Sequence, residues 1–322
     1  MDRLVSMLRA AGDPTRLRLL LLLRQAELTV SELIEIVGQS QPRVSRHLKL
    51  LGEAGLVERF KEGSWVFCRA ADRGTGAELG AAIAALADPA SQEADKARLA
   101  HVRAARANAA ASYFKSNAAE WERIRALHAP DKDVEAAIAR RITAGGIENF
   151  LDAGTGTGRM LELIAPHAKR AVGIDVSPDM LAIARDRLLR GNIQNAQVRL
   201  GDTYRLPFPN GAAGAGFDVV LFHQVLHYLD DPGAAVTEAA RVMTPGGRLL
   251  IADFAPHRLE FLRDEFAHRR LGFSDREVES WFAAAGLASS GSETIAPAAD
   301  NEKLTVKLWL ATAKAKSKKE AA

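Results

Sequence analysis

The segment LDAGTGTG, from Leu151 to Gly158, constrains this chain more than any other feature. An apolar strand is expected to end at Asp152, and Gly154, Gly156 and Gly158 then form a tight turn into a helix. Glycine is needed in such a turn because the backbone adopts unusual dihedral angles and a ligand must approach it closely. The segment therefore predicts a ligand site at the carboxyl end of a strand.

The spacing of the acidic residues indicates which class of ligand the turn binds. A dinucleotide-binding turn would have a glycine three residues after Gly156, where Arg159 stands. The next strand ends at Asp175, 17 residues after the last glycine, where a carboxylate can accept both ribose hydroxyls. The third strand ends at Asp202, suited to an adenine amino group. Each aspartate could instead cap the helix that follows it, but the combination with Asp152 and the glycines favours S-adenosylmethionine (SAM).

Short β-rich runs alternate with helix-length segments from Glu148 onward. These runs are NFLDAG, RAVGIDV, AQVRLGD, FDVVLFH and GRLLIADF. Such a rhythm predicts a parallel sheet covered by helices. The length of 322 residues, with 48% hydrophobic content, suits two modest domains and connecting helices better than one core.

From about Asn149 to Thr312 the chain resembles the class I SAM-dependent methyltransferases, particularly the branch related to ubiquinone and menaquinone methyltransferases. The resemblance rests on GIDVSPDMLAIAR, GDTYRLPFP, FDVV and RVMTPGGRLLIADF. It implies a doubly wound, seven-stranded Rossmann-like α/β sheet, in which EKLTVKLWLAT is an antiparallel strand. The cofactor contacts that it implies are Asp152, Gly154 and Gly156 around the methionine part, Asp175 on the ribose, Met180, Asp202 and Thr203 at the adenine, and Tyr113 from a lid helix. Gly158, the last glycine of the turn, is also a predicted cofactor-binding residue.

The loop FHQVLHYLDDP follows the fourth strand, and in the family that it resembles this loop faces the transferred methyl group. His223, Gln224, His227 and Tyr228 are therefore acceptor-site candidates, with His227 and His223 as the predicted catalytic residues. Methyl transfer depends mainly on positioning, and the intrinsic pKa range of histidine suits a general base. Alternatively, His227 only packs and hydrogen-bonds at a strand end.

The methyl acceptor itself stays open. No NPPY-type sequence follows the fourth strand, which disfavours amino groups of DNA bases or glutamine, and the predicted methyltransferase domain has none of the cysteines used in arsenic methylation. Further on, Asp264 and His268 lie four residues apart, which would place them on one face of a helix. That face could bind a polar acceptor, although a solvated charged surface is the favoured interpretation.

The first 72 residues predict four short helices and a hairpin. Asp13 is a good N-cap before Pro14, Thr29 and Glu32 have capping-box spacing, and Gly38 ends that helix. The helix QPRVSRHLKLLGEAG follows, and LVERFKEGSWVFCRA then alternates as two strands around a Glu-Gly turn.

The helix QPRVSRHLKLLGEAG has the pattern of a DNA recognition helix. Val44, Leu48 and Leu51 form one apolar stripe, and residues 39–51 contain three Lys or Arg and no acidic residue. Short polar and arginine side chains read base edges while cations contact phosphates. The predicted DNA contacts are Gln41, Arg43, Ser45, Arg46 and Lys49, with a winged-helix domain used only for protein contact as the alternative.

Residues 2–70 resemble the ArsR-type winged-helix repressors, whose recognition helix ends in the same L..AGLV pattern. Metal-sensing members have two cysteines where this chain has Thr29 and Ser31, and hydroxyls do not replace thiolates for soft metals. No metal site is therefore predicted. The resemblance implies a homodimer, for which residues 1–11 and 76–87 are apolar enough.

We expect a winged helix-turn-helix over residues 1–72, a helical connector with dimerisation and lid helices over 73–145, a SAM-dependent methyltransferase domain over 146–312, and a basic tail over 313–322. The single Cys68 and the lack of a leader or membrane segment predict a cytoplasmic protein. The expected partners are double-stranded operator DNA and a small-molecule methyl acceptor. The rival hypothesis is a regulator that senses SAM or S-adenosylhomocysteine (SAH) without turnover, controlling methionine or one-carbon genes.

Overall fold

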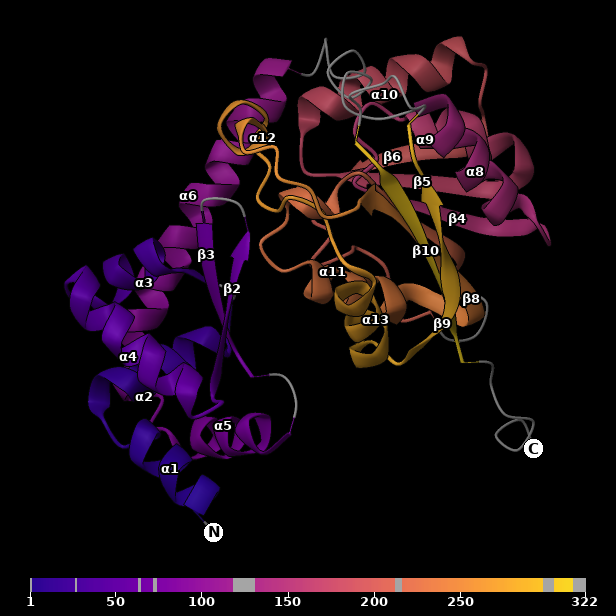
Figure 1. Ribbon diagram of the computed structural model, residues 1–322. Helices are drawn as coiled ribbons and strands as arrows, with labels where there is room; N and C mark the ends of the chain where they lie inside the picture. The colour runs from indigo at the N-terminus through magenta and orange to yellow at the C-terminus, as the bar shows by residue number, and fades with distance from the viewer. Residues whose placement is uncertain are drawn as a thin grey trace. The chain divides into compact units, whose positions relative to one another are not determined.

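The computed structural model describes residues 2–26, 28–62, 65–71, 74–117, 131–211, 216–297 and 304–314. The chain divides into two compact units, Met1–Ala109 and Ala110–Ala322 (Figure 1). In the described part, no helix has the length and apolar character needed to cross a bilayer.

The first unit is a winged helix-turn-helix. A small antiparallel sheet of order β1-β3-β2 supports the helices, and the sequence did not indicate the two-residue strand β1. The elements are α1 (Asp2–Ala11), α2 (Pro14–Leu23), β1 (Leu28–Thr29), α3 (Val30–Val37), α4 (Gln41–Glu53), β2 (Val57–Glu62), β3 (Trp65–Ala70), α5 (Gly74–Leu86), the 3-10 turn η1 (Ala90–Gln92) and α6 (Glu93–Asn117).

Local capping fixes where these helices begin. Asp13 accepts a hydrogen bond from the Arg16 N–H at the start of α2. The capping box at α3 is complete, since Thr29 Oγ1 accepts from the Glu32 N–H and Glu32 accepts from the Thr29 N–H. Gly38 ends α3 in the left-handed conformation, with φ +68°. The helix starts predicted from sequence are confirmed.

The second unit is an α/β sheet of seven strands in the order β6-β5-β4-β7-β8-β10-β9. Its elements are α8 (Asp131–Thr143), β4 (Ile147–Ala153), α9 (Arg159–Ile164), η3 (Ala165–His167), β5 (Ala168–Asp175), α10 (Pro178–Arg190), β6 (Ala196–Leu200), β7 (Phe217–His223), η4 (Leu226–Tyr228), α11 (Pro232–Val242), β8 (Met243–Phe254), α12 (Phe261–Phe266), α13 (Asp275–Ala284), β9 (Leu287–Ile295) and β10 (Val306–Ala313).

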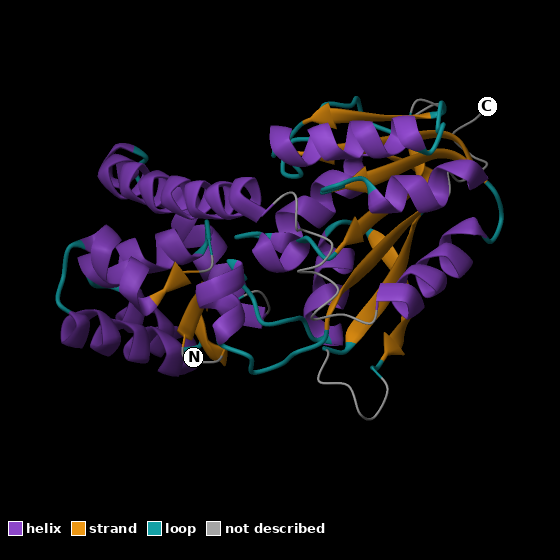
Figure 2. Ribbon diagram, turned by 90° about the horizontal axis from the view of Figure 1, so that it is seen from above, coloured by secondary structure: helices purple, strands orange, loops and turns teal. Residues whose placement is uncertain are grey.

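Helices cover both faces of this sheet, as Figure 2 shows. Phe150, Val219 and Leu221 pack with α8 and α9 on one face, whereas Leu151 and Val220 pack with α11 and α13 on the other. Successive strand residues are thus buried on opposite sides, which explains the continuous apolar runs of the sequence. The predicted doubly wound fold is confirmed.

Two details differ from the sequence expectations. The predicted antiparallel strand is β10, which lies inside the sheet because β9, a strand that the sequence did not single out, pairs with its outer edge. In addition, α12 ends at Phe266, because Ala267 adopts the left-handed conformation with φ +56°. Asp264 and His268 therefore do not share one helix face, and that prediction was wrong.

The capping box of α3 supports a stability prediction. Thr29→Ala should destabilise α3 by about 1 kcal/mol, since it removes the side-chain acceptor at the N-cap. Hydrogen exchange of the α3 amides should then accelerate by roughly fivefold. The matched control is Ser31→Ala, an exposed position in the same turn, which should change exchange little. Equal acceleration of exchange in both variants would show that the Thr29 cap does not stabilise α3.

Candidate functional site

The glycine turn after β4 has the geometry that a close ligand needs. Gly154, Gly156 and Gly158 have φ values of +81°, +51° and +80°, in the region that favours glycine. A Cβ on Gly154 would lie 2.5 Å from Val225 Cγ2, and one on Gly158 would lie 2.9 Å from Ala184 Cβ. The turn thus presents bare backbone at the carboxyl end of the sheet and leaves no room for side chains at these two positions.

Asp175 ties this turn to the neighbouring strand. Its Oδ2 accepts from the Gly156 N–H at 2.8 Å, and its Oδ1 accepts from the Ser177 N–H at 2.9 Å. Burial raises the pKa of Asp175, while the N–H groups of Ser177, Gly156 and Val176 lower it. Each carboxylate oxygen has a further lone pair, so Asp175 can still accept from a hydroxyl.

The other predicted cofactor residues surround the same strand ends. Asp152 is buried and accepts from Thr155 Oγ1 at 2.6 Å. Asp202 is exposed two residues beyond β6, and its Oδ1 accepts from the Tyr204 N–H. Thr203 and Met180 are buried, with Met180 in the first turn of α10. Since β4, β5 and β6 are parallel neighbours, their carboxyl ends meet at one edge. The remaining candidate, Tyr113, is in α6, and its side chain lies outside the described residues.

These features fit SAM. The bare glycine turn suits the amino-acid end of the cofactor, and a carboxylate at the tip of the adjacent strand suits vicinal hydroxyls. The strand ends place carboxylates in the crevice where open α/β sheets bind ligands.

The loop after β7 contains a buried histidine–aspartate pair. His227 Nδ1 lies 2.7 Å from Asp253 Oδ1, and the two residues are 1% and 0% exposed. Asp253 Oδ2 also accepts from the Leu226 N–H at 3.0 Å. Because a carboxylate only accepts hydrogen bonds, Nδ1 carries the hydrogen of a neutral ring and Nε2 has the lone pair. Within the described residues, this buried Nε2 has no hydrogen-bond partner.

A second acceptor-loop candidate also points to a polar site. Gln224 is 5% exposed and has φ +51°, although it is not glycine. Its backbone N–H donates to the Ala252 carbonyl, but its side-chain nitrogen is buried without a partner among the described residues. His223, the last residue of β7, is 8% exposed. The loop thus offers both a donor and an acceptor atom for a ligand.

The residues that follow α12, from His268 to Arg270, are buried. The backbone N–H groups of Arg269 and Arg270 donate to the His227 carbonyl at 2.9 and 3.0 Å. Arg269 pairs with Asp230, Arg270 pairs with Glu277, and the His268 ring centroid lies 4.2 Å from that of His227. The expectation of a solvated charged face holds for Asp264 and Glu265, which are exposed. It was wrong for His268 and both arginines, which are buried, the arginines through partners distant in sequence.

The recognition-helix candidates lie on the open face of α4. Gln41, Arg43, Arg46 and Lys49 are exposed and Ser45 is half-buried. On the opposite side, the three apolar residues Val44, Leu48 and Leu51 are fully buried. In the part of the chain that the structure describes, there is no cluster of three or more metal-ligating side chains.

Comparison with known proteins finds a family model that matches a stretch in each of the two units. A methyltransferase-domain model matches residues 151–251, and a model of the arsR family of bacterial regulatory proteins matches residues 13–59. The two matched stretches make residues 13–59 similar to arsR-family regulators and residues 151–251 similar to methyltransferase domains.

Relatives of the methyltransferase domain cover part of the chain. A demethylmenaquinone methyltransferase of Tropheryma whipplei is 40% identical over 119 residues, 36% of this chain and 45% of the relative. A malonyl-[acyl-carrier protein] O-methyltransferase of Serratia marcescens is 31% identical over 156 residues, 48% of this chain and 56% of the relative. The chain thus spans about half the length of these two relatives.

A solved methyltransferase of Haloferax volcanii, in complex with a methyltransferase activator, shares the fold. Its TM-score is 0.52 at 23% identity, over 65% of this chain and 99% of that chain.

The geometry of Asp175 leads to a binding prediction. Asp175→Ala should lower the affinity for SAH at least about tenfold, because it removes a hydroxyl acceptor and the anchor of the Gly156 N–H. Calorimetry on the full chain measures this. Asp186→Ala, on the exposed surface of α10, is the matched control. Unchanged affinity in the Asp175 variant would exclude this carboxylate from the site.

Proposed function

We propose that this protein is a DNA-binding transcriptional regulator whose second domain is a SAM-dependent methyltransferase acting on a small molecule. The observation that carries the proposal is the glycine turn held by Asp175 beside a buried histidine with an unpartnered Nε2. A cofactor cradle and an oriented base lie at neighbouring strand ends, as a transferase needs.

In this proposal the residues of the chain bind SAM and orient the acceptor for methyl transfer. The glycine turn and Asp152 hold the amino-acid end of SAM, Asp175 the ribose, and Met180 with Thr203 the adenine. SAM supplies, when bound, an electrophilic methyl group. His227 Nε2 takes the proton of an acceptor hydroxyl or carbon acid, while Asp253 fixes the ring and stabilises the imidazolium that forms.

Burial favours a small acceptor. Because His227 is 1% exposed, a proton donor must enter the domain to reach Nε2. Gln224 can donate to an acceptor oxygen, since its buried side-chain nitrogen has no partner among the described residues. An acceptor with one acidic O–H or C–H beside an oxygen would satisfy both atoms. The single Cys68 is consistent with a cytoplasmic location, which we include in the proposal.

Labelled-methyl transfer tests catalysis against sensing. With SAM as donor and a small-molecule extract as acceptor pool, the wild type should transfer label. His227→Gln should lower the rate by roughly 10²–10⁴ while SAH affinity stays unchanged. Asp253→Asn should lower the rate in the same direction, because it loses the carboxylate that orients Nδ1. SAH binding without transfer in the wild type would support the sensor instead.

The first domain is proposed to read operator DNA as a homodimer. The exposed cations of α4 support DNA contact, and α1 exposes Leu4, Val5 and Leu8 at 41%, 38% and 50%, which supports a dimer seam. An ArsR-type dimer would read an inverted repeat with half-sites about one helical turn apart.

Two substitutions on α4 separate base reading from phosphate contact. On a site selected from random duplexes, Arg46→Ala should lower the binding free energy by about 1–3 kcal/mol and relax sequence specificity. Lys49→Ala should instead weaken binding to all DNA sequences similarly and reduce the salt dependence of binding. Gel-shift titrations at two salt concentrations measure both. If neither substitution changed binding, α4 would not be the recognition helix.

A further inference from the structure

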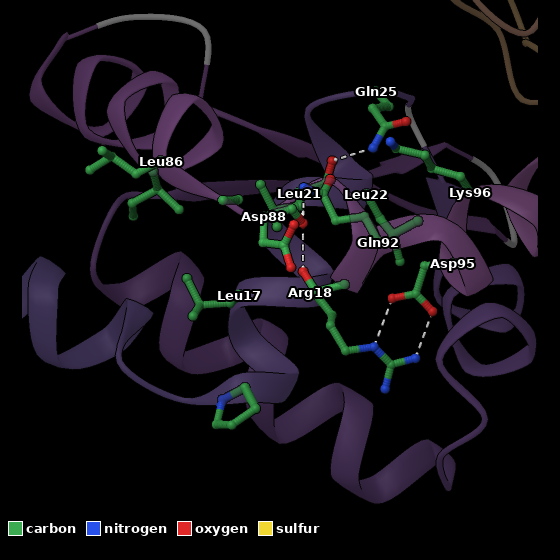
Figure 3. A pocket seen from close by; sticks show the side chains of 14 residues that line it. Leu17, Arg18, Leu21, Leu22, Gln25, Leu86, Asp88, Gln92, Asp95 and Lys96 are labelled. Carbon is green, nitrogen blue, oxygen red and sulfur yellow. Dashed lines mark hydrogen bonds and ion pairs between the residues drawn. The ribbon is translucent and has the colours of Figure 1, made fainter.

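A cavity of about 500 Å³ lies within the first unit, between α2, the end of α5 and the start of α6 (Figure 3). Its volume falls within the roughly 300–1,000 Å³ typical of small-molecule sites. The apolar part of its wall comes from α2 and α5, and consists of Pro14, Leu17, Leu21, Leu22, Ile83 and Leu86. The cavity belongs to the regulatory domain and shares no residue with the cofactor site.

The charged groups in this wall already have partners. Arg18 donates to both carboxylate oxygens of Asp95 at 2.7 Å, and Figure 3 shows this two-pronged pair. Asp95 is 7% exposed, and its hydrogen bond raises the pKa of Arg18. Asp88 accepts from the Ala90 N–H, and Lys96 lies 3.2 Å from a glutamate of its own helix.

The pairing of charged groups in the wall determines which kind of ligand the cavity favours. A charged ligand would lose hydration and gain little, since Arg18 and Asp95 neutralise each other and Lys96 pairs with Glu93. The remaining ionic group, Asp88, is exposed to solvent, which screens its charge. A neutral, mainly apolar molecule would instead bury its surface against the leucines and Ile83. Gln25, whose side chain donates to the Leu21 carbonyl, and Gln92 could meet a single polar group at the rim.

The cavity wall is also connected to the turn before the recognition helix. Arg18 donates to the Val37 carbonyl at 3.3 Å as well as to Asp95. Arg98, one turn further along α6, donates to the Ile36 carbonyl at 2.9 Å. Both carbonyls are at the end of α3, immediately before the turn into α4. A molecule that moved α6 away from α2 would therefore strain the contacts that hold this turn.

We propose that this cavity binds a neutral, mainly apolar small molecule, and that its occupancy adjusts the turn preceding the recognition helix. The regulator would then have an input separate from the cofactor. This goes beyond the proposed function, because it requires neither methyl transfer nor SAM.

The neutral fluorescent probe N-phenyl-1-naphthylamine tests the site in the full-length protein. Its fluorescence should rise on binding, and saturating SAH should leave that rise unchanged. Leu86→Trp and Ile83→Trp should each lower the affinity for the probe at least about tenfold by filling the cavity. Leu86 is 86% exposed within one chain, so its substitution should not disturb folding. Because residues 83 and 86 belong to the predicted dimer seam, the oligomeric state of both variants is measured alongside probe binding. The matched control is Leu189→Trp, a 79% exposed position on α10, which should bind the probe like the wild type.

Several results would overturn the proposal. Displacement by SAH would place the probe in the cofactor site, and wild-type affinity in both tryptophan variants would place it elsewhere. Weaker probe binding at higher protein concentration would mean that a second copy covers the cavity. For the coupling, bound probe should change hydrogen exchange at the amides of residues 38–41, and unchanged exchange there would refute the effect on the turn.

Discussion

The cofactor side of the second domain depends on the hydrogen bonds of one carboxylate. Asp175 binds the Gly156 N–H from the turn after β4 and the Ser177 N–H at the start of α10. Ser177 in turn caps α10 by accepting from the Met180 N–H. A single side chain thus fixes the glycine turn, the next helix and the position of Met180. Burial raises the pKa of Asp175, and the backbone donors offset only part of that cost.

Much of this architecture could be predicted from sequence, because it follows from local rules. The strand runs, the glycine turn and the capping box at Thr29 each depend on neighbouring residues, and the structure has all of them. The role of Thr29 as an N-cap also gives a structural reason for a hydroxyl at this position.

The parts that sequence could not reveal depend on distant partners. Asp253 stands in an apolar strand, LLIADF, and pairs with a histidine 26 residues earlier. One signal was available, since a lone acidic residue in a buried run needs a partner. The burial of Arg269 and Arg270 could not be inferred, because Asp230 and Glu277, which neutralise them, come from other segments. Helical spacing also cannot show that Ala267 turns left-handed.

The helix α6 begins in the first unit and its residues run past the boundary with the second. It is continuous from Glu93 to Asn117, across the boundary between the units, and 25 residues of α-helix span about 37 Å. At its start, Asp95 and Arg98 bind the helix-turn-helix. Any coupling must be reciprocal, so operator DNA would change cofactor affinity by the same factor as the cofactor changes operator affinity.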